Sequence, residues 1–351
     1  MKYTMAIIGF GGMGSWHAEN VLSHIDGITV KGVYDIQKSA QDKALSHGLY
    51  VYGSLKELLE DREIDLVTIA TPNDSHKDYA IALLKAGKNV ICEKPVTMNV
   101  SQLEEIMETA EKSGKIFSIH QNRRWDKDFV IIKTLLDQGE LGRPYFIESR
   151  VQGSRRAMYG WRGHKTNGGG MVLDWGVHLL DQLLNLIDSP VVSVDAHLFS
   201  LYSDEVDDNI KIFLRFENKV SALCEMSTNC LINHPRWHIS CTDGTAVIED
   251  WSCKGKIVKL KADSQMSWSE DIVYTEAGPT RTMAPRPEYT TNILELPEVQ
   301  TDWSDYYKNI VNVMEGKAEL IVKPQQALRV MKVIEKVFES EETGAGVSCH
   351  I

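Results

Sequence analysis

A short apolar run near the start of the chain leads directly into a glycine-rich turn: Met5-Ala6-Ile7-Ile8-Gly9-Phe10-Gly11-Gly12-Met13-Gly14. This G-x-G-x-x-G spacing after a strand is typical of a β-α-β unit that binds a dinucleotide. In such a unit Gly9 allows the tight turn, Gly11 lets the backbone approach a pyrophosphate, and Gly14 permits close packing of helix on strand. The N-terminal dipole of the next helix then faces the phosphates. The alternative is a glycine-rich turn without a ligand.

The acidic residue that follows the second strand indicates which dinucleotide is bound. The predicted strand Thr29–Tyr34 ends next to Asp35, which lies 21 residues after Gly14. A carboxylate at this place accepts hydrogen bonds from the adenosine ribose and repels a 2′-phosphate. We therefore expect NAD rather than NADP as the cofactor. Lys38, in the following turn, is the residue that could instead reach a 2′-phosphate.

The bulk properties are those of a globular enzyme and exclude several other classes. A chain of 351 residues exceeds one ordinary core, and its hydrophobic and charged fractions of 43% and 25% are usual. The net charge of −11 argues against a nucleic-acid partner. We expect no membrane association, because no apolar run reaches the roughly 18 residues of a span. The first strand also begins too early to leave room for a signal peptide.

The cysteines indicate the cellular compartment. The chain has six of them, at positions 92, 224, 230, 241, 253 and 349, with neither C-x-x-C spacing nor a disulfide framework. This distribution is typical of reduced thiols, so we expect a cytoplasmic protein.

Short apolar strands alternate with helical patterns up to residue 121. The predicted strands are Thr4–Gly9, Thr29–Tyr34, Leu66–Ala70, Asn89–Cys92 and Ile116–His120, and the predicted helices are Ser15–Ile25, Ser54–Asp61, Ser75–Lys85 and Ser101–Ser113. Ser54 and Ser101 each precede a glutamate at capping-box spacing. The alternation predicts a doubly wound parallel sheet with helices on both faces, whose cofactor lies at the carboxyl ends of the strands.

The pattern changes after Asn122. A helix is predicted at Lys127–Gln138, a strand at Tyr145–Gln152, a polar loop up to Gly170, and a helix at Val172–Ile187. From Val191 to Tyr274, alternating strands predict an antiparallel sheet with one buried face; examples are Ile210–Phe216, Ser221–Met226, His238–Thr242 and Lys256–Leu260. We expect residues 275–297 to be irregular and two helices, Asp302–Glu315 and Pro324–Ser340, to close the chain.

A second constellation of candidate functional residues lies in Gly168-Gly169-Gly170-Met171-Val172-Leu173-Asp174-Trp175-Gly176-Val177-His178. Asp174 and His178 are four residues apart, so a helix would place both on one face. A nearby carboxylate raises the pKa of an imidazole and orients its ring, as a base that deprotonates an alcohol requires. The alternative is an ordinary pair on a helix surface. Asp181 extends the pattern to a metal-like spacing, but we expect it in a packing network and predict no metal.

Lys94 is the third candidate for chemistry. It lies in Glu93-Lys94-Pro95, directly after the predicted strand Asn89–Cys92 and at the same sheet edge as the glycine turn. A lysine there could donate a hydrogen bond to a developing alkoxide. The alternative is an ordinary surface lysine.

Four motifs, in this order and spacing, resemble the Gfo/Idh/MocA oxidoreductases, the family of glucose–fructose oxidoreductase and inositol dehydrogenase. They are GFGGMG at 9–14, ATPNDSH at 70–76, CEKP at 92–95 and GGGMVLDWGVH at 168–178. The resemblance covers essentially the whole chain. It implies an N-terminal Rossmann domain at 1–121 and a C-terminal α/β domain at 122–351 with a large, mostly antiparallel open sheet. That sheet often makes oligomer contacts in the family, which implies a homodimer or homotetramer.

The resemblance also implies roles for individual residues. The catalytic lysine, aspartate and histidine of the family correspond to Lys94, Asp174 and His178. Besides the glycine turn and Asp35, the residues expected to bind the cofactor are Thr71, Pro72, Asn73, His76, Glu93, Lys94 and Asn122. Besides the catalytic residues, those expected to bind the substrate are Arg124, Trp161 and Arg162. A helix N-cap is an equal alternative for Asn73, an interface anchor is the alternative for Trp161, and we expect at least one arginine after the fifth strand to be structural.

The sequence therefore predicts an NAD-dependent dehydrogenase that oxidises a secondary hydroxyl of a sugar, glycoside or inositol. His178, oriented by Asp174, would take the hydroxyl proton while Lys94 stabilises the reacting oxygen, and either residue could be the formal base. The polar loop Gly153–Thr166 favours a polyol ring over an aliphatic alcohol. One alternative is a redox-neutral glycoside cleavage or epimerisation through a keto intermediate. Another is a nucleotide-sensing regulator, which would be expected to lose Lys94 and His178.

Overall fold

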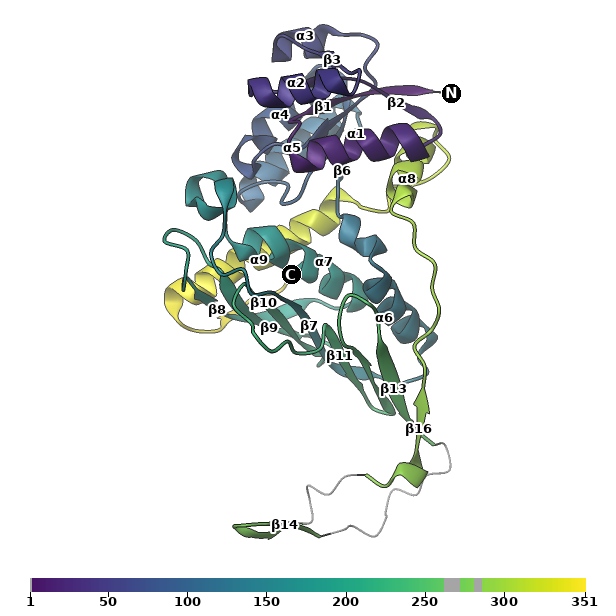
Figure 1. Ribbon diagram of the computed structural model, residues 1–351, viewed down its shortest axis with the longest axis vertical. Coiled ribbons are helices and arrows are strands. Elements are labelled where there is room, and N and C mark those ends of the chain that lie inside the picture. The colour runs from purple at the N-terminus through teal and green to yellow at the C-terminus, as the bar shows by residue number, and fades with distance from the viewer. Residues whose placement is uncertain (1, 262–271, 281–285) are drawn as a thin grey trace.

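The computed structural model describes residues 2–261, 272–280 and 286–351, and the strands within these ranges form two large sheets and one small hairpin (Figure 1). The first sheet has six parallel strands in the order β3-β2-β1-β4-β5-β6. The second has nine strands in the order β16-β13-β12-β11-β7-β10-β9-β8-β17, and all its pairs are antiparallel except β7 with β10. The predicted fold class, a Rossmann-like sheet followed by a mostly antiparallel sheet, is confirmed.

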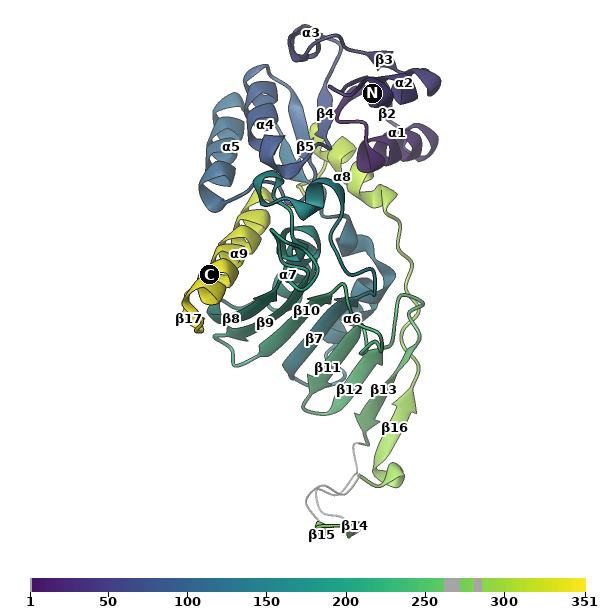
Figure 2. The same cartoon turned by 60° about the vertical axis from the view of Figure 1, so that its left-hand side comes forward.

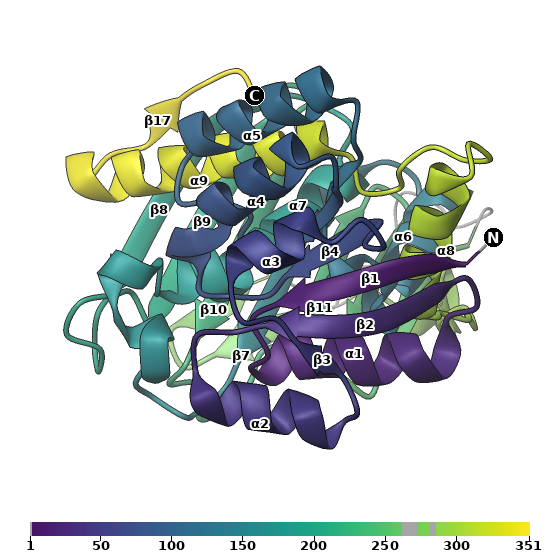
Figure 3. The same cartoon turned by 90° about the horizontal axis from the view of Figure 1, so that it is seen from above.

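The first sheet and its helices occupy the N-terminal third of the chain. The strands are β1 (Tyr3–Ile8), β2 (Ile28–Tyr34), β3 (Tyr50–Val51), β4 (Leu66–Ile69), β5 (Asn89–Cys92) and β6 (Phe117–Ile119). The helices are α1 (Gly12–His24), α2 (Lys38–Ser46), α3 (Leu55–Glu60), α4 (His76–Lys85) and α5 (Val100–Ser113). Every residue of β4 is buried, because helices cover both faces of the sheet. Figure 3 shows the parallel β1 and β2 side by side.

The second sheet has helices on the side that faces the first sheet (Figure 2). Its strands are β7 (Pro144–Gln152), β8 (Val191–Phe199), β9 (Asn209–Phe216), β10 (Ser221–Ser227), β11 (Trp237–Cys241), β12 (Gly244–Ile248), β13 (Gly255–Leu260), β16 (Thr291–Leu294) and β17 (Val347–Ser348). The helices of this layer are α6 (Lys127–Gln138), α7 (Val177–Leu186) and α9 (Pro324–Thr343), whereas α8 (Ser304–Met314) lies beside α1. Buried and exposed residues alternate along β9, as a sheet with one buried face requires.

The two closing helices both pack on elements of the first sheet and its helices, and α9 also packs on elements of the second. Helix α8 packs on α1, and the hydroxyl of its Tyr307 lies 2.6 Å from His17 Nδ1. Helix α9 packs on α5 and β6 and also on α7 and β8. Among the described residues, none of the helices combines the length and apolar character that crossing a membrane requires.

The structure differs from the predicted elements in several places, among them β17, which was not predicted. Helix α2 and strand β3 were not predicted. Helix α5 begins after Asn99, whose side chain accepts a hydrogen bond from the Gln102 N–H, so the predicted cap at Ser101 is wrong. The region predicted to be irregular contains β16, which pairs with β13, and β15 (Gly278–Thr280), which forms a short hairpin with β14 (Val273–Thr275) at the start of that region. Residues 281–285 of the region lie outside the described ranges. Finally, the helix predicted from Val172 begins with a π-helical turn, Val172–Gly176.

Candidate active site

The glycine turn between β1 and α1 has the shape that a dinucleotide requires. Gly9 has φ +86°, and a Cβ on Gly14 would lie 1.9 Å from the Gly9 carbonyl oxygen, so both positions exclude a side chain. A Cβ on Gly11 or Gly12 would meet open space. Helix α1 begins here with no side-chain cap and no acidic residue in its first turn. Its first N–H groups are therefore suited to an anion, and the turn fits the phosphates of a dinucleotide.

Asp35 lies beside this turn at the end of β2. Its two carboxylate oxygens accept hydrogen bonds from the N–H of Phe10, at 2.6 Å, and of Gln37, at 2.7 Å. Lys38, which could have reached a 2′-phosphate, pairs with Asp42 on the exposed surface of α2. Lys43, also on α2, donates to Ser15 Oγ at 2.6 Å and lies over the Phe10 ring. The position of this cation near the turn could not be predicted from the sequence, because α2 itself was not predicted.

Lys94 and Asp174 form the centre of the candidate site. Lys94 Nζ donates to Asp174 Oδ1 at 3.0 Å and to the Asp174 carbonyl oxygen at 2.7 Å. Arg162 Nε donates to the same Oδ1 at 3.2 Å. Burial by itself would raise the pKa of Asp174, but Lys94 and Arg162 outweigh it and lower the pKa. The carboxylate is thus ionised at neutral pH and holds both cations in place. The Lys94–Pro95 peptide bond is cis.

His178 is buried at the start of α7, where Gln121 orients it. Its Nδ1 lies 3.1 Å from Gln121 Oε1. Since that oxygen can only accept, Nδ1 carries the hydrogen and Nε2 keeps a lone pair. Burial, followed by the Lys94 and Arg123 cations, holds the pKa of His178 well below its ordinary value. The ring is therefore neutral at pH 7 and able to accept a proton.

The expected pairing of Asp174 with His178 is wrong in this structure. The Asp174 carboxylate contacts Lys94 and Arg162, and the pKa of His178 is lowered rather than raised. The reason is the π-helical turn that contains Asp174. Hydrogen bonds in a π turn join residues five apart, so residues four apart no longer stack as they do in an α-helix. Asp181, the third member of the metal-like pattern, is bound by Arg124.

Arg124 and Trp161 were expected at the substrate. Arg124 is buried instead, with Nε and Nη2 donating to the two oxygens of Asp181 at 2.7 and 2.6 Å. Its Nη1 donates to the Ile321 carbonyl, so this arginine is the structural one. Trp161 is partly exposed, and the Arg162 guanidinium lies 4.5 Å from the centre of its ring. The Trp161 ring therefore lies next to Arg162, which donates a hydrogen bond to Asp174.

The loop after β4 is held against the polar loop and the Lys94 segment. Asn73 is buried and donates to the Gly168 carbonyl oxygen at 2.8 Å, and a Cβ on Gly168 would lie 3.0 Å from the Asn73 Cβ. His76 is fully buried, with its two ring nitrogens 2.9 Å from the carbonyl oxygens of Pro95 and Thr71. The side chain of His76 thus joins two loops and has no surface to offer a cofactor, contrary to the expectation. Asn73 likewise links two loops and does not cap a helix.

The remaining cofactor candidates lie at the same sheet edge. Thr71 and Pro72 directly follow β4, and Thr71 Cγ2 would lie 2.9 Å from a Cβ on Gly9. Asn122 begins a short 3-10 helix after β6. Glu93 follows β5, but its side chain is buried and both oxygens accept hydrogen bonds from the protein. Only its backbone is left for a cofactor.

Comparisons with known proteins agree with this geometry. The model of an oxidoreductase family with an NAD-binding Rossmann fold, named GFO_IDH_MocA, matches residues 3–121, and the C-terminal domain model of the same family matches residues 129–247. An NAD-binding protein from Listeria innocua is 45% identical, with a TM-score of 0.95 over 99% of both chains. The oxidoreductase YdgJ of Escherichia coli (strain K12) is 30% identical over 81% of each chain. The scyllo-inositol 2-dehydrogenase (NADP(+)) IolW of Bacillus subtilis (strain 168) is 26% identical over 96% of this chain and 93% of its own.

Proposed function

Since the chain belongs to the Gfo/Idh/MocA family of NAD-binding oxidoreductases, we propose that it is an NAD-dependent dehydrogenase of a secondary hydroxyl on a sugar, glycoside or inositol. The observation that supports this most directly is the pairing of two groups at the end of the first sheet. A lysine ammonium, held by Asp174, lies where its charge lowers the pKa of a buried, neutral histidine. One group can donate to the reacting oxygen and the other can take its proton.

Three residues of the chain have separate roles in the proposed reaction. His178 receives the hydroxyl proton on Nε2, because Gln121 occupies Nδ1. Lys94 donates a hydrogen bond to the same substrate oxygen and stabilises its negative charge. Asp174 keeps Lys94 and Arg162 in position. The bound nicotinamide supplies the acceptor for the hydride that leaves the carbon.

We propose NAD rather than NADP as the preferred cofactor. Asp35 lies at the end of β2, and a 2′-phosphate there would approach a carboxylate in a partly desolvated place. Lys38 is neutralised by Asp42. Lys43 is the cation that most favours NADP, since it lies over Phe10 in the glycine turn and could attract a 2′-phosphate. The Bacillus subtilis relative carries NADP(+) in its name, so competition between the two dinucleotides at equal concentration is the test of this choice.

Arginine–aromatic pairs in and beside the polar loop favour a polyol ring as substrate. Arg155 lies over Tyr159 and Arg162 over Trp161, while Arg156 lies over Tyr202. Such pairs combine hydrogen-bond donors with ring faces, as the hydroxyls and C–H faces of a sugar require. A short aliphatic alcohol would leave the donors unpaired.

A substrate panel tests the proposed reaction. The panel contains inositols, hexoses, alkyl and aryl glucosides and small aliphatic alcohols, each with NAD⁺ and NADP⁺, and is followed by the absorbance of the reduced cofactor. We expect a cyclic polyol or glycoside with NAD⁺ to give the highest rate. Product formation without net NADH would favour the redox-neutral reaction instead. If aliphatic alcohols exceed every cyclic substrate, the substrate class is wrong.

We also propose that the chain folds as two domains, 1–121 and 122–351, and that the exposed face of the second sheet forms a homodimer or homotetramer. The exposed face of β9 includes Lys211, Phe213 and Arg215, and the ring of Phe213 lies 6.1 Å from that of Phe146 on β7. Sedimentation velocity tests this assembly, with Phe213→Glu as the variant. A monomer in the wild-type protein would contradict it.

A further inference from the structure

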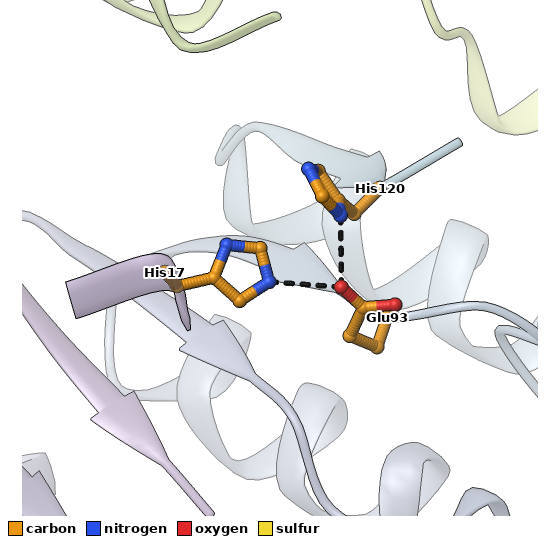
Figure 4. Close-up of side chains that lie close together, drawn as sticks. All are labelled: His17, Glu93 and His120. Atoms are coloured by element: carbon orange, nitrogen blue, oxygen red, sulfur yellow. Dashed lines mark hydrogen bonds and ion pairs between the residues drawn. The ribbon is translucent and has the colours of Figure 1, made fainter. Parts of the chain in front are cut away.

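A buried carboxylate with two imidazoles lies directly behind Lys94. Glu93 Oε1 is 2.8 Å from His17 Nε2 and 2.8 Å from His120 Nδ1, and Figure 4 shows both rings directed at this one oxygen. His17 and His120 are almost fully inaccessible, and Glu93 is also buried. The three residues come from α1, from the end of β5 and from the end of β6. None of them takes part in the proposed proton transfer.

The hydrogen bonds of this cluster define a chain of donors that ends on Glu93. Burial raises the pKa of the Tyr307 hydroxyl, which therefore stays protonated and donates to His17 Nδ1 at 2.6 Å. Burial, followed by the neighbouring His120, lowers the pKa of His17, so its ring is neutral and donates from Nε2. Burial by itself would raise the pKa of Glu93, but His120 and His17 outweigh it and hold that pKa well below its ordinary range. The Glu93 carboxylate is thus ionised although it is buried.

Glu93 is also connected to both reacting groups. Its other oxygen, Oε2, accepts a hydrogen bond from the backbone N–H of Lys94 at 3.2 Å. His120 immediately precedes Gln121, whose side chain orients His178. The carboxylate therefore touches the segment of Lys94 directly and the segment of Gln121 through one imidazole. His17 joins it to α1, three residues after the last glycine of the dinucleotide turn.

We propose that Glu93, held by His17 and His120, is the positioning residue of the site, fixing the Lys94 backbone and the Gln121 that orients His178. This rests on the proposed function in so far as Lys94 and His178 are the reacting groups. The same three side chains also have the composition of a metal site, since their candidate ligand atoms lie within 4.8 Å of one another. Hydrogen bonding explains the geometry better, because both imidazoles point at a single oxygen and the other nitrogen of His17 already has Tyr307.

Two measurements test the proposal without a substrate. The first is hydrogen exchange at the Lys94 amide, followed by mass spectrometry of peptides that cover residues 93–98. We expect Glu93→Gln to speed this exchange by about tenfold or more, since it removes the charged acceptor. The second is ¹⁵N NMR of the histidines at pH 7, in which His178 should carry its hydrogen on Nδ1 and His17 on Nε2. Glu93→Gln should broaden or mix the His178 tautomers.

Adjacent tyrosines provide a second variant and a matched control. Tyr307→Phe keeps the carboxylate and removes the donor to His17, so it should change the His17 and His120 signals and speed exchange at 93–98 by a smaller factor. Tyr306 is equally buried on α8, but its hydroxyl bonds Ser118 Oγ at 3.2 Å. Tyr306→Phe should therefore leave both readouts unchanged. Equal effects of the two tyrosine variants would reduce the cluster to core packing and overturn the proposal.

Steady-state kinetics of Glu93→Gln and binding of added Zn²⁺ provide two further tests. With the substrate found by the panel, Glu93→Gln should lower kcat by about tenfold or more while KM for NAD changes by less than about threefold. The acid limb of kcat/KM should also move to lower pH, because the charges that face His178 are Lys94, Arg123, His120 and Glu93 and only the last is negative.

Stoichiometric binding of added Zn²⁺ with loss of the imidazole N–H signals would overturn the proposal. If no compound turns over, the dehydrogenase proposal fails, while the exchange and NMR results still decide the role of Glu93.

Discussion

Lys94 and His178 have different tasks in the proposed reaction, yet removing either should affect the rate in the same way. We expect Lys94→Ala and His178→Ala each to lower kcat by about 100-fold or more, because a positioned proton donor or acceptor contributes on that scale. The dissociation constant of NAD, measured by tryptophan fluorescence, should change little. Lys56→Ala, on the exposed surface of α3, is the control. Near-normal turnover of His178→Ala would leave Lys94 as the only base.

The surroundings of His178 predict an unusual pH dependence. Its pKa lies well below 6.5 through burial and the Lys94 and Arg123 cations, so the ring loses its base function only below that pH. The acid limb of kcat/KM for alcohol oxidation should therefore lie below pH 6.5. Arg123→Gln removes one of the two cations and should shift the limb to higher pH. A wild-type limb at pH 7 or above would contradict this account.

The residue types of the site could be predicted from the sequence, but their partners could not. Motif spacing indicated Lys94, Asp174 and His178, because each follows a strand or a glycine-rich loop. The contact between Lys94 and Asp174 joins residues 80 apart, and that between His178 and Gln121 joins residues 57 apart. Such contacts depend on how the sheets pack together, about which a local pattern carries no information. The π turn at Asp174 likewise has no signature in the local spacing.

At the scale of elements, helix α5 offers a direct comparison between two candidate caps. Asn99 Oδ1 accepts the Gln102 N–H at 3.0 Å, whereas Ser101 already lies inside the helix. We expect Asn99→Ala to lower the free energy of unfolding by about 1 kcal/mol, as loss of an N-cap does. Ser101→Ala, the matched control, should cost less than half as much. Urea denaturation measures both, and the reverse order would restore the cap predicted from the sequence.

Apolar sequence patterns predicted the elements that bury several residues and missed those that bury few. Strands β1, β2, β4 and β5 begin and end within a residue or two of their predicted limits. Helix α2, by contrast, buries only Ala44, so its sequence has no apolar stripe. Strand β16 lies at the edge of the second sheet with most residues exposed, which removes the alternation that marks a strand.

For the whole molecule, two adjacent aspartates predict opposite effects of pH on stability. Burial raises the pKa of Asp207 to about 6, although its side chain accepts the Val172 N–H at 2.8 Å. A raised carboxyl pKa means that the unfolded state ionises at lower pH than the folded state, so the fold loses stability as pH rises from about 4 to about 6, and the loss is complete at higher pH. Between pH 5 and pH 8, Asp207→Asn should gain stability relative to the wild type by about 1.5 kcal/mol. Urea unfolding at the two pH values measures the gain.

Asp208 is the control for this prediction, because its pKa moves the other way. Burial would raise that pKa, but the N–H groups of Leu201, Tyr202 and Ser203 and the Asn209 amide outweigh it and lower it. The ionised group thus stabilises the fold at neutral pH and loses this effect as pH falls below its unfolded value of about 4. Asp208→Asn should therefore be less stable than the wild type at pH 8, and its free energy of unfolding should approach that of the wild type in acid. If raising the pH changes the stability of both variants, relative to the wild type, in the same direction, the opposite pKa shifts of Asp207 and Asp208 are wrong.

The hydrogen bond between Tyr307 and His17 joins residues 290 positions apart, and this separation affects how the protein is made. A ribosome releases His17 and the whole first sheet long before it releases α8. Until then the surface of α1 that α8 covers stays open to solvent, and the imidazole beside Glu93 lacks its donor. The nascent chain can form the dinucleotide turn early, but the hydrogen bond from Tyr307 to the cluster beside Lys94 can form only after α8 has been released. The cluster behind Lys94 is thereby completed only after strands β7 to β13, which precede α8 in the chain, have been synthesised.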